Sequence, residues 1–70
     1  MDKITLRACR VNKGMSREEV AKRLGKSVQT ILMWETGKTV PDKANIAMMS
    51  NLYGVPTSFI IVGKSTQNTK

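Results

Sequence analysis

Residues 16–38 read SREEVAKRLGKSVQTILMWETGK, which is the pattern of two short helices joined by a tight turn. Ser16 and Glu19 have the spacing of an N-terminal capping box, and Gly25 supplies the left-handed residue that ends the first helix. Apolar residues at helical spacing predict the inward side of that helix: Val20, Ala21 and Leu24. Together these features predict a helix-turn-helix, whose second helix can enter a major groove.

The second helix of this pair has an inward and an outward face. Ile31 and Trp34 lie on the inward face, where they would set the angle at which the helix is presented. The outward face mixes apolar and polar side chains: Val28, Gln29, Leu32 and Met33. This mixture suits base reading, because glutamine can pair with adenine while apolar groups contact thymine methyls. The alternative is a protein-contact patch, since exposed apolar clusters commonly mark interfaces.

Composition indicates one small basic domain. The 70 residues carry twelve Lys/Arg against five Asp/Glu, a net charge of +7 that favours nucleic acid or an anionic membrane surface as partner. The single cysteine, Cys9, excludes an intrachain disulfide, and histidine is absent. No nucleophile–base pair or phosphate-binding glycine loop occurs, so we expect no enzyme activity, no cofactor, no metal site and no small-molecule ligand.

Three further helices are predicted, over residues 4–12, from about residue 42 to residue 53, and after Pro56. Their expected inward residues are, in that order, Leu6, Cys9 and Arg10; Ile46, Met49 and Tyr53; and Phe59 and Ile60. Alternating strand patterns and internal repeats are absent from the sequence. We therefore predict an all-α, compact five-helix bundle over residues 1–62, followed by a polar disordered tail over residues 63–70.

Short sequence motifs characteristic of one family extend over most of the chain. They are LRACR (6–10), GMS (14–16), EEVAKRLG (18–25), Ser27, TI (30–31), WETGK (34–38), Pro41 and LYGVPTSFI (52–60). With them the chain resembles the DNA-binding domains of phage repressors and Cro proteins, the XRE-type helix-turn-helix family. The resemblance implies a five-helix domain that binds operator DNA, usually as a symmetric pair of chains, and occludes promoter DNA.

The resemblance also implies roles for individual residues. Arg10 and Glu35 match a family pair that forms an internal salt bridge, and both lie on inward-facing stripes; two solvated charges are the alternative. Arg17 replaces a glutamine that usually touches the DNA backbone, and arginine can still reach a phosphate. Cations near the ends of the helices, and hydroxyls at a helix N-terminus, extend this set of expected phosphate contacts to Arg17, Lys26, Ser27, Thr30, Lys38 and Lys43. Because Val28, Leu32 and Met33 replace mostly polar residues of the family, the operator sequence is not predicted.

The expected partner is double-stranded DNA, bound by a weak homodimer that tightens on DNA through Ile61 and Val62. The short length favours a Cro-like or small-repressor role over a ligand-gated one. A protein-interaction module of the antitoxin or anti-repressor type is the rival hypothesis. No membrane association is expected, because the basic residues do not form one face opposite a continuous apolar face, and no apolar run approaches a membrane span. A nucleoid-associated cytoplasmic location follows.

Overall fold

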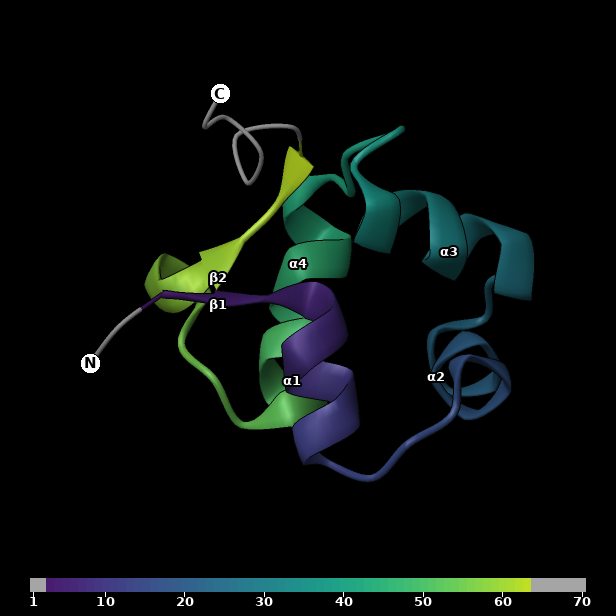
Figure 1. Cartoon of the computed structure of the whole chain (residues 1–70), viewed down its shortest axis with the longest axis horizontal. Coiled ribbons are helices and arrows are strands. Elements are labelled where there is room, and N and C mark those ends of the chain that lie inside the picture. Colours follow the sequence, from purple (N-terminus) through teal and green to yellow (C-terminus); the bar gives the residue numbers. More distant parts are fainter. Residues whose placement is uncertain (1–2, 64–70) are drawn as a thin grey trace.

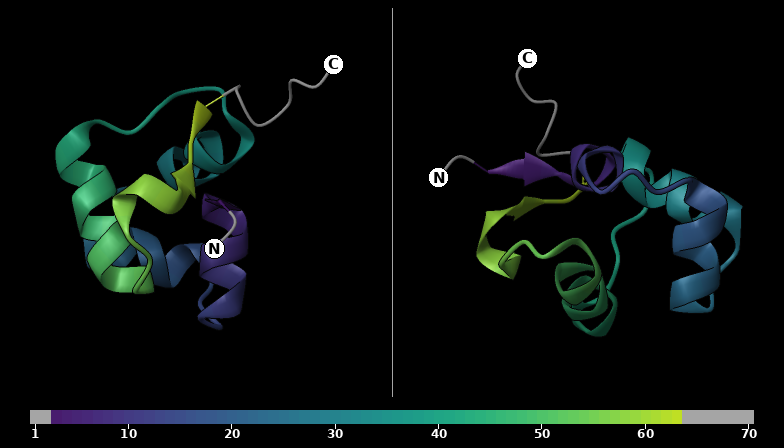
Figure 2. Two further views of the ribbon diagram at one scale, coloured as in Figure 1. Left: turned by 90° about the vertical axis from the view of Figure 1, so that its left-hand side faces the viewer. Right: turned by 90° about the horizontal axis from the view of Figure 1, so that it is seen from below.

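The computed structural model describes residues 3–63 and contains four α-helices and two very short strands in that range. In chain order the elements are β1 (Ile4–Thr5), α1 (Leu6–Asn12), α2 (Arg17–Leu24), α3 (Val28–Thr36), α4 (Lys43–Tyr53), a 3-10 helix (Thr57–Phe59) and β2 (Ile60–Ile61). The strands pair in parallel, with Ile4 opposite Ile60 and Thr5 opposite Ile61. The helix pair α2–α3 lies at one end of the molecule and the strand pair at the other, with α1 and α4 between them (Figures 1 and 2).

Each α-helix begins at a residue whose side-chain oxygen accepts a backbone N–H three residues further on. These N-cap residues are Thr5, Ser16, Ser27 and Asp42. The heavy-atom distances of these caps are 2.9–3.1 Å, so each helix satisfies one otherwise unpaired first-turn amide. The bounds of the helices therefore follow from local chemistry.

The turn between α2 and α3 depends on Gly25, which has a φ of 69°. This left-handed conformation lets the Lys26 N–H donate to the Ala21 carbonyl at 2.9 Å, the long hydrogen bond of a Schellman motif. Ser27 then opens α3 immediately. Two residues thus suffice to separate the end of α2 from the cap of α3.

One small core joins all four helices and β2. Its buried members are Leu6, Cys9, Val20, Ala21, Leu24, Ile31, Trp34, Met49, Tyr53 and Ile60. All of them were expected to face inward. Ile46 and Phe59, which were also expected inside, are half-buried instead. The inward stripes read from helical spacing therefore describe most of the core.

The prediction of five α-helices in an all-α fold is wrong at both ends of the described chain. The segment after Pro56 makes only a three-residue 3-10 turn before it extends into β2, and Ile4–Thr5 forms β1 instead of starting α1. Strands of two residues are too short to show an alternating pattern, so their pairing leaves no local signal. Of the predicted tail, only Gly63 lies within the described residues, and it is buried.

Candidate nucleic-acid interface

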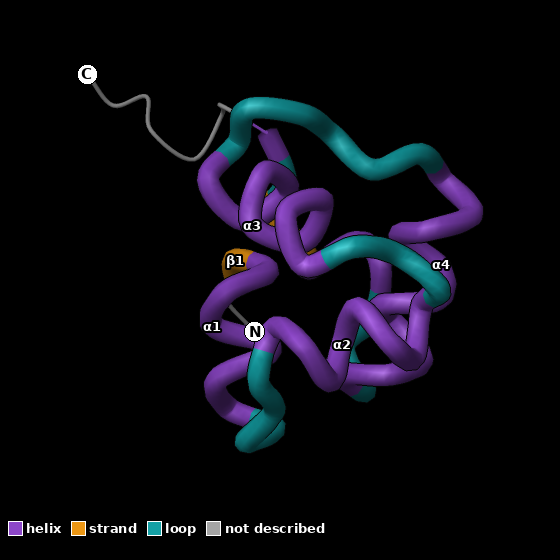
Figure 3. Tube along the Cα trace, turned by 90° about the vertical axis from the view of Figure 1, so that its right-hand side faces the viewer, coloured by secondary structure: helices purple, strands orange, loops and turns teal. Residues whose placement is uncertain are grey.

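The outward residues of α3 differ in exposure along the helix. Val28 and Gln29, in the first turn, are exposed, with Val28 at 39%. Leu32 and Met33, one turn later, are half-buried, yet neither is among the half-buried apolar residues that pack against the core. Figure 3 views the molecule from its α2–α3 end. The first turn of α3 is therefore the most accessible part of the predicted reading face.

The start of α3 combines two hydroxyls with backbone amides. Ser27 Oγ accepts the Thr30 N–H at 3.1 Å and lies 3.0 Å from Thr30 Oγ1. The amides of Val28 and Gln29 belong to the first turn, which has no intrahelical acceptors for them. Amides at a helix N-terminus can bind an anion such as a phosphate. The two hydroxyls already hydrogen-bond to each other, so Ser27 acts chiefly as the cap.

Two of the three predicted lysine contacts flank α3, and the third begins α4. Lys26 is exposed in the turn before the helix, and Lys38 is exposed just after it. Lys43 is the first residue of α4, where it borders a surface hollow of about 420 Å³ together with Ile46 and Thr57. The three lysines therefore lie on three different segments: the turn before α3, the loop after α3 and the start of α4.

A buried carboxylate ties the first three helices together. Glu35, whose side chain is 2% exposed, accepts a hydrogen bond of 2.7 Å from Arg10 Nε and another of 3.3 Å from Arg10 Nη2. Arg10 Nη1 donates to the Met15 carbonyl at 3.0 Å. The hydrogen bond with Glu35 raises the pKa of Arg10 above its ordinary value, against the opposing effect of burial. The structure thus brings together the pair expected from the sequence.

Arg17 takes a position that the sequence did not predict. Its Nε donates to Glu35 Oε1 at 3.0 Å, so one carboxylate receives two arginines. Arg17 had been expected only as a phosphate contact. The available signal was weak, because an arginine in the first turn of a helix usually faces solvent. Only the approach of α2 to α3 shows that its guanidinium reaches Glu35.

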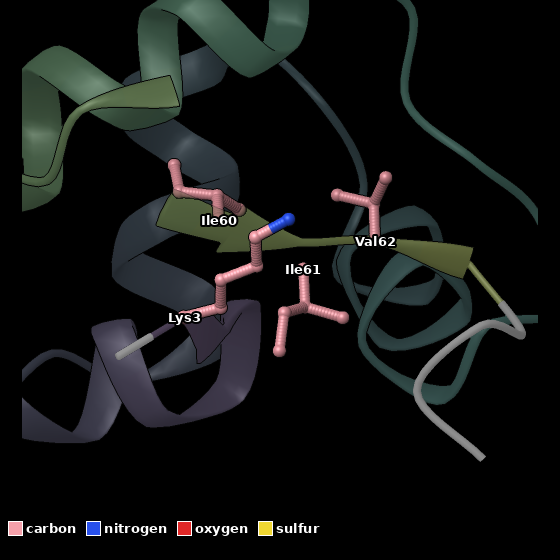
Figure 4. Close-up of a pocket in the computed structure, with 4 residues that line it drawn as sticks. All are labelled: Lys3, Ile60, Ile61 and Val62. Carbon is pink, nitrogen blue, oxygen red and sulfur yellow. The ribbon is translucent and has the colours of Figure 1, made fainter. Parts of the chain in front are cut away.

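The expected dimer residues lie on an extended segment. Ile61 and Val62 are half-buried and, with Lys3 and Ile60, border a surface hollow of about 410 Å³. Ile60 and Val62 point to one side of the strand and Ile61 to the other (Figure 4). Val62 packs against the core. The two residues predicted to meet a partner therefore do not share one face.

Other exposed apolar side chains were not predicted. Val11, Val40 and Met48 are 52%, 59% and 43% exposed, and they lie on α1, in the α3–α4 loop and on α4.

Within residues 3–63 no three His, Cys, Asp or Glu side chains come close enough to hold a metal ion. In the same range, no helix has the length and apolar character needed to cross a membrane.

Comparison with known proteins relates this geometry to a family. Residues 6–60 match the family described as Helix-turn-helix. The chain is 37% identical over 62 residues to an SPbeta prophage-derived uncharacterized HTH-type transcriptional regulator, YonR, of Bacillus subtilis (strain 168), covering 89% of this chain and 57% of the relative. It is 32% identical over 53 residues to Multiprotein-bridging factor 1c of Arabidopsis thaliana, covering 76% of this chain and 36% of that protein.

The chain thus spans little more than half of one relative and about a third of the other. No solved structure matches this chain significantly. The matched residues include α1 to α4, the turn at Gly25 and the 3-10 helix. The chain belongs to the XRE-type helix-turn-helix family of DNA-binding domains.

Proposed function

We propose that this chain is a sequence-specific, double-stranded DNA-binding transcriptional regulator of the Cro-like or small-repressor type. The observation that carries the proposal is the exposed first turn of α3, with Val28 and Gln29 outward and Lys26 exposed just before the Ser27 cap. In a helix-turn-helix, the N-terminal turn of the second helix is the part that contacts base edges in the major groove. The relative from Bacillus subtilis bears the name of a transcriptional regulator, which supports the same function here.

Base reading is assigned to the outward side of α3. Gln29 can make a bidentate pair with adenine N6 and N7, and Val28 can contact a thymine methyl in the major groove. Leu32 and Met33 are half-buried, so only their exposed outer atoms could contact bases. The specificity of the protein would then depend chiefly on the first turn.

Phosphate contacts are assigned to residues at the edges of the reading face. They are Arg17, Lys26, Ser27, Thr30, Lys38 and Lys43. Cations placed beside both ends of α3 would meet the two backbones that border one major groove. Such contacts fix position and add affinity for all sequences, and they make binding fall with salt.

Operator binding is assigned to a weak homodimer that tightens on DNA. A helix of nine residues reads too few base pairs to define a genomic site, so two copies related by a two-fold axis would read an inverted repeat. Ile61 is the better candidate for the dimer contact, because Val62 packs against the core of its own chain. Binding of this kind would place the protein on the nucleoid and occlude promoters.

A protein-interaction role on the same fold is the second candidate. It is favoured by the exposed apolar side chains of Val40 and Met48 and by the name of the plant relative, a multiprotein-bridging factor. This role predicts a complex with a protein partner that is insensitive to salt. DNA binding predicts an affinity that falls as the salt concentration rises.

Selection of bound sequences from random duplex DNA tests the first proposal. The expected result is an inverted repeat with half-site centres about 10 base pairs apart, or a multiple of that spacing. Gln29→Ala should then weaken binding to the selected site by ~1–3 kcal/mol and relax the choice at one base pair. The matched control is Asn51→Ala, an exposed amide on α4, which should leave binding unchanged. Equal weakening of every sequence by Gln29→Ala would refute its role in base reading.

A further inference from the structure

Glu35 is shared unequally by its two arginines. Arg10 uses Nε and Nη2 on the carboxylate and Nη1 on the Met15 carbonyl, so its guanidinium is enclosed. Arg17 uses only Nε, at 3.0 Å from Glu35 Oε1. Its side chain is 35% exposed, whereas that of Arg10 is 10% exposed. The Arg10 guanidinium is thus buried with three donors on protein acceptors, whereas Arg17 contacts Glu35 through Nε and is partly exposed.

We propose that Glu35 is a positioning residue for DNA binding, which holds Arg17 in a fixed orientation so that its Nη groups meet a backbone phosphate. This inference rests on the proposed function and deepens it. Arg17 begins α2, and Glu35 is near the end of α3, so the contact links the two helices of the motif. The side chain of Glu35 is buried and would touch no DNA.

The geometry gives this arrangement a physical advantage. A guanidinium is planar, so a hydrogen bond from Nε fixes the plane in which the Nη groups can donate to two phosphate oxygens. A free arginine would lose rotamer entropy on binding, but a tethered one has already lost most of it on folding. The tether therefore favours binding without adding a contact to DNA.

The charge balance of the cluster permits this role. A carboxylate beside a phosphate-binding arginine would ordinarily oppose the phosphate by like-charge repulsion. Here two guanidiniums share one carboxylate, Arg10 at 2.7 Å and Arg17 at 3.0 Å, so the cluster of three side chains carries one net positive charge. Arg17 can therefore be anchored by Glu35 and still attract an anion.

Arg17→Lys tests the tether because it keeps the charge and removes the planar fork. One ammonium cannot occupy the Nε position on Glu35 and also offer two parallel donors to a phosphate. Affinity for duplex DNA should fall about tenfold for specific and random sequences alike, the equivalent of one charge-assisted hydrogen bond. The slope of log K against log salt should stay nearly the same, since the charge remains. Circular dichroism confirms that the variant is folded.

The matched control is Arg23→Lys, an exposed arginine in the last turn of the same helix, whose affinity should change less than about twofold. Glu35→Gln completes a double-mutant cycle: it should weaken binding in the wild-type chain but not in Arg17→Lys. Arginine Nε–H resonances of the free protein give a reading independent of DNA, with the Arg17 proton protected from exchange.

Arg17→Lys binding within about twofold of the wild type would overturn the tether and leave the proposed function intact. An Arg17 Nε–H that exchanges as fast as that of Arg23 would overturn it as well. A wild-type chain without salt-dependent binding to any duplex would refute the proposed function, and the positioning role with it.

Discussion

The α2–α3 pair and the β1–β2 pair hold the two ends of this domain in different ways. Between α2 and α3, a serine cap and a left-handed glycine act within a few residues of one another. Between β1 and β2, Ile4 meets Ile60, so almost the whole chain separates the partners. The first contact is specified by residue types and the second by the closure of the fold.

This difference has an energetic side. The turn at Gly25 closes a short loop at low entropic cost, whereas the strand pair closes a loop that includes most of the chain, at a higher entropic cost. The strand pair has two residues on each side, so its hydrogen bonds alone provide little stability. Its contribution must come from side chains that join the core, chiefly Ile60.

The largest expected effect is at Glu35, which joins the α2–α3 end to α1. Glu35→Ala leaves Arg10 buried without its carboxylate and should lower the free energy of unfolding by ~3–5 kcal/mol. Arg10→Ala should lower it less, because Arg17 still pairs with the carboxylate. Denaturant melts measure both, with Glu18→Ala, an exposed residue of α2, as the control. Losses below about half a kcal/mol for Glu35→Ala would contradict a structural role for the cluster.

Ile60→Ala tests the strand-pair end and should have the next largest effect. Ile60 is 9% exposed and belongs to the core, so truncation should lower the free energy of unfolding by ~2–4 kcal/mol. Ile61→Ala removes the same atoms from a half-buried position on the other side of the strand and should have less than about half that effect. Equal losses would show that β2 contributes through its backbone instead of its inward side chain.

Gly25→Ala tests the turn between α2 and α3 and should have the smallest effect on the free energy of unfolding. A Cβ at this position would meet nothing within 4 Å, so the expected loss of ~1–2 kcal/mol comes from the left-handed backbone alone. Gly25→Asn should recover part of it, because asparagine tolerates this conformation better than alanine. Thermal melts of both variants provide the measurement. A loss as large as that of Ile60→Ala would mean that the turn is coupled to packing.

The parts of the fold that were predicted correctly are those encoded within one or two helical turns. Ser16, Ser27 and Gly25 have local roles, so their positions in the sequence indicate where α2 and α3 begin and end. Ile31 and Trp34 face inward as their spacing indicates. The segment after Pro56 was predicted wrongly as a fifth helix, because two adjacent apolar residues, Phe59 and Ile60, fit a helix and a strand equally well.

In the candidate site, too, features that depend on near neighbours in the chain could be predicted, and those that depend on remote segments could not. Its outward set on α3 could be named from the helical period, but the different exposure of Val28 and Met33 could not, since that depends on neighbouring segments. Arg17 was expected at a phosphate, but its contact with Glu35 was not, because a pattern along one helix carries no distance to another. The assignments of base and phosphate contacts remain predictions.

The helix-turn-helix, the family and the residue types on the outward side of α3 could all be inferred from the sequence. These depend on caps, a left-handed glycine and helical spacing, all of which act between near neighbours in the chain. Three features became apparent only in three dimensions: Ile4 pairs with Ile60, Ile61 and Val62 face opposite sides, and two arginines share Glu35. Those features arise when remote segments are packed around one core, because burial brings their side chains within hydrogen-bonding and van der Waals distance.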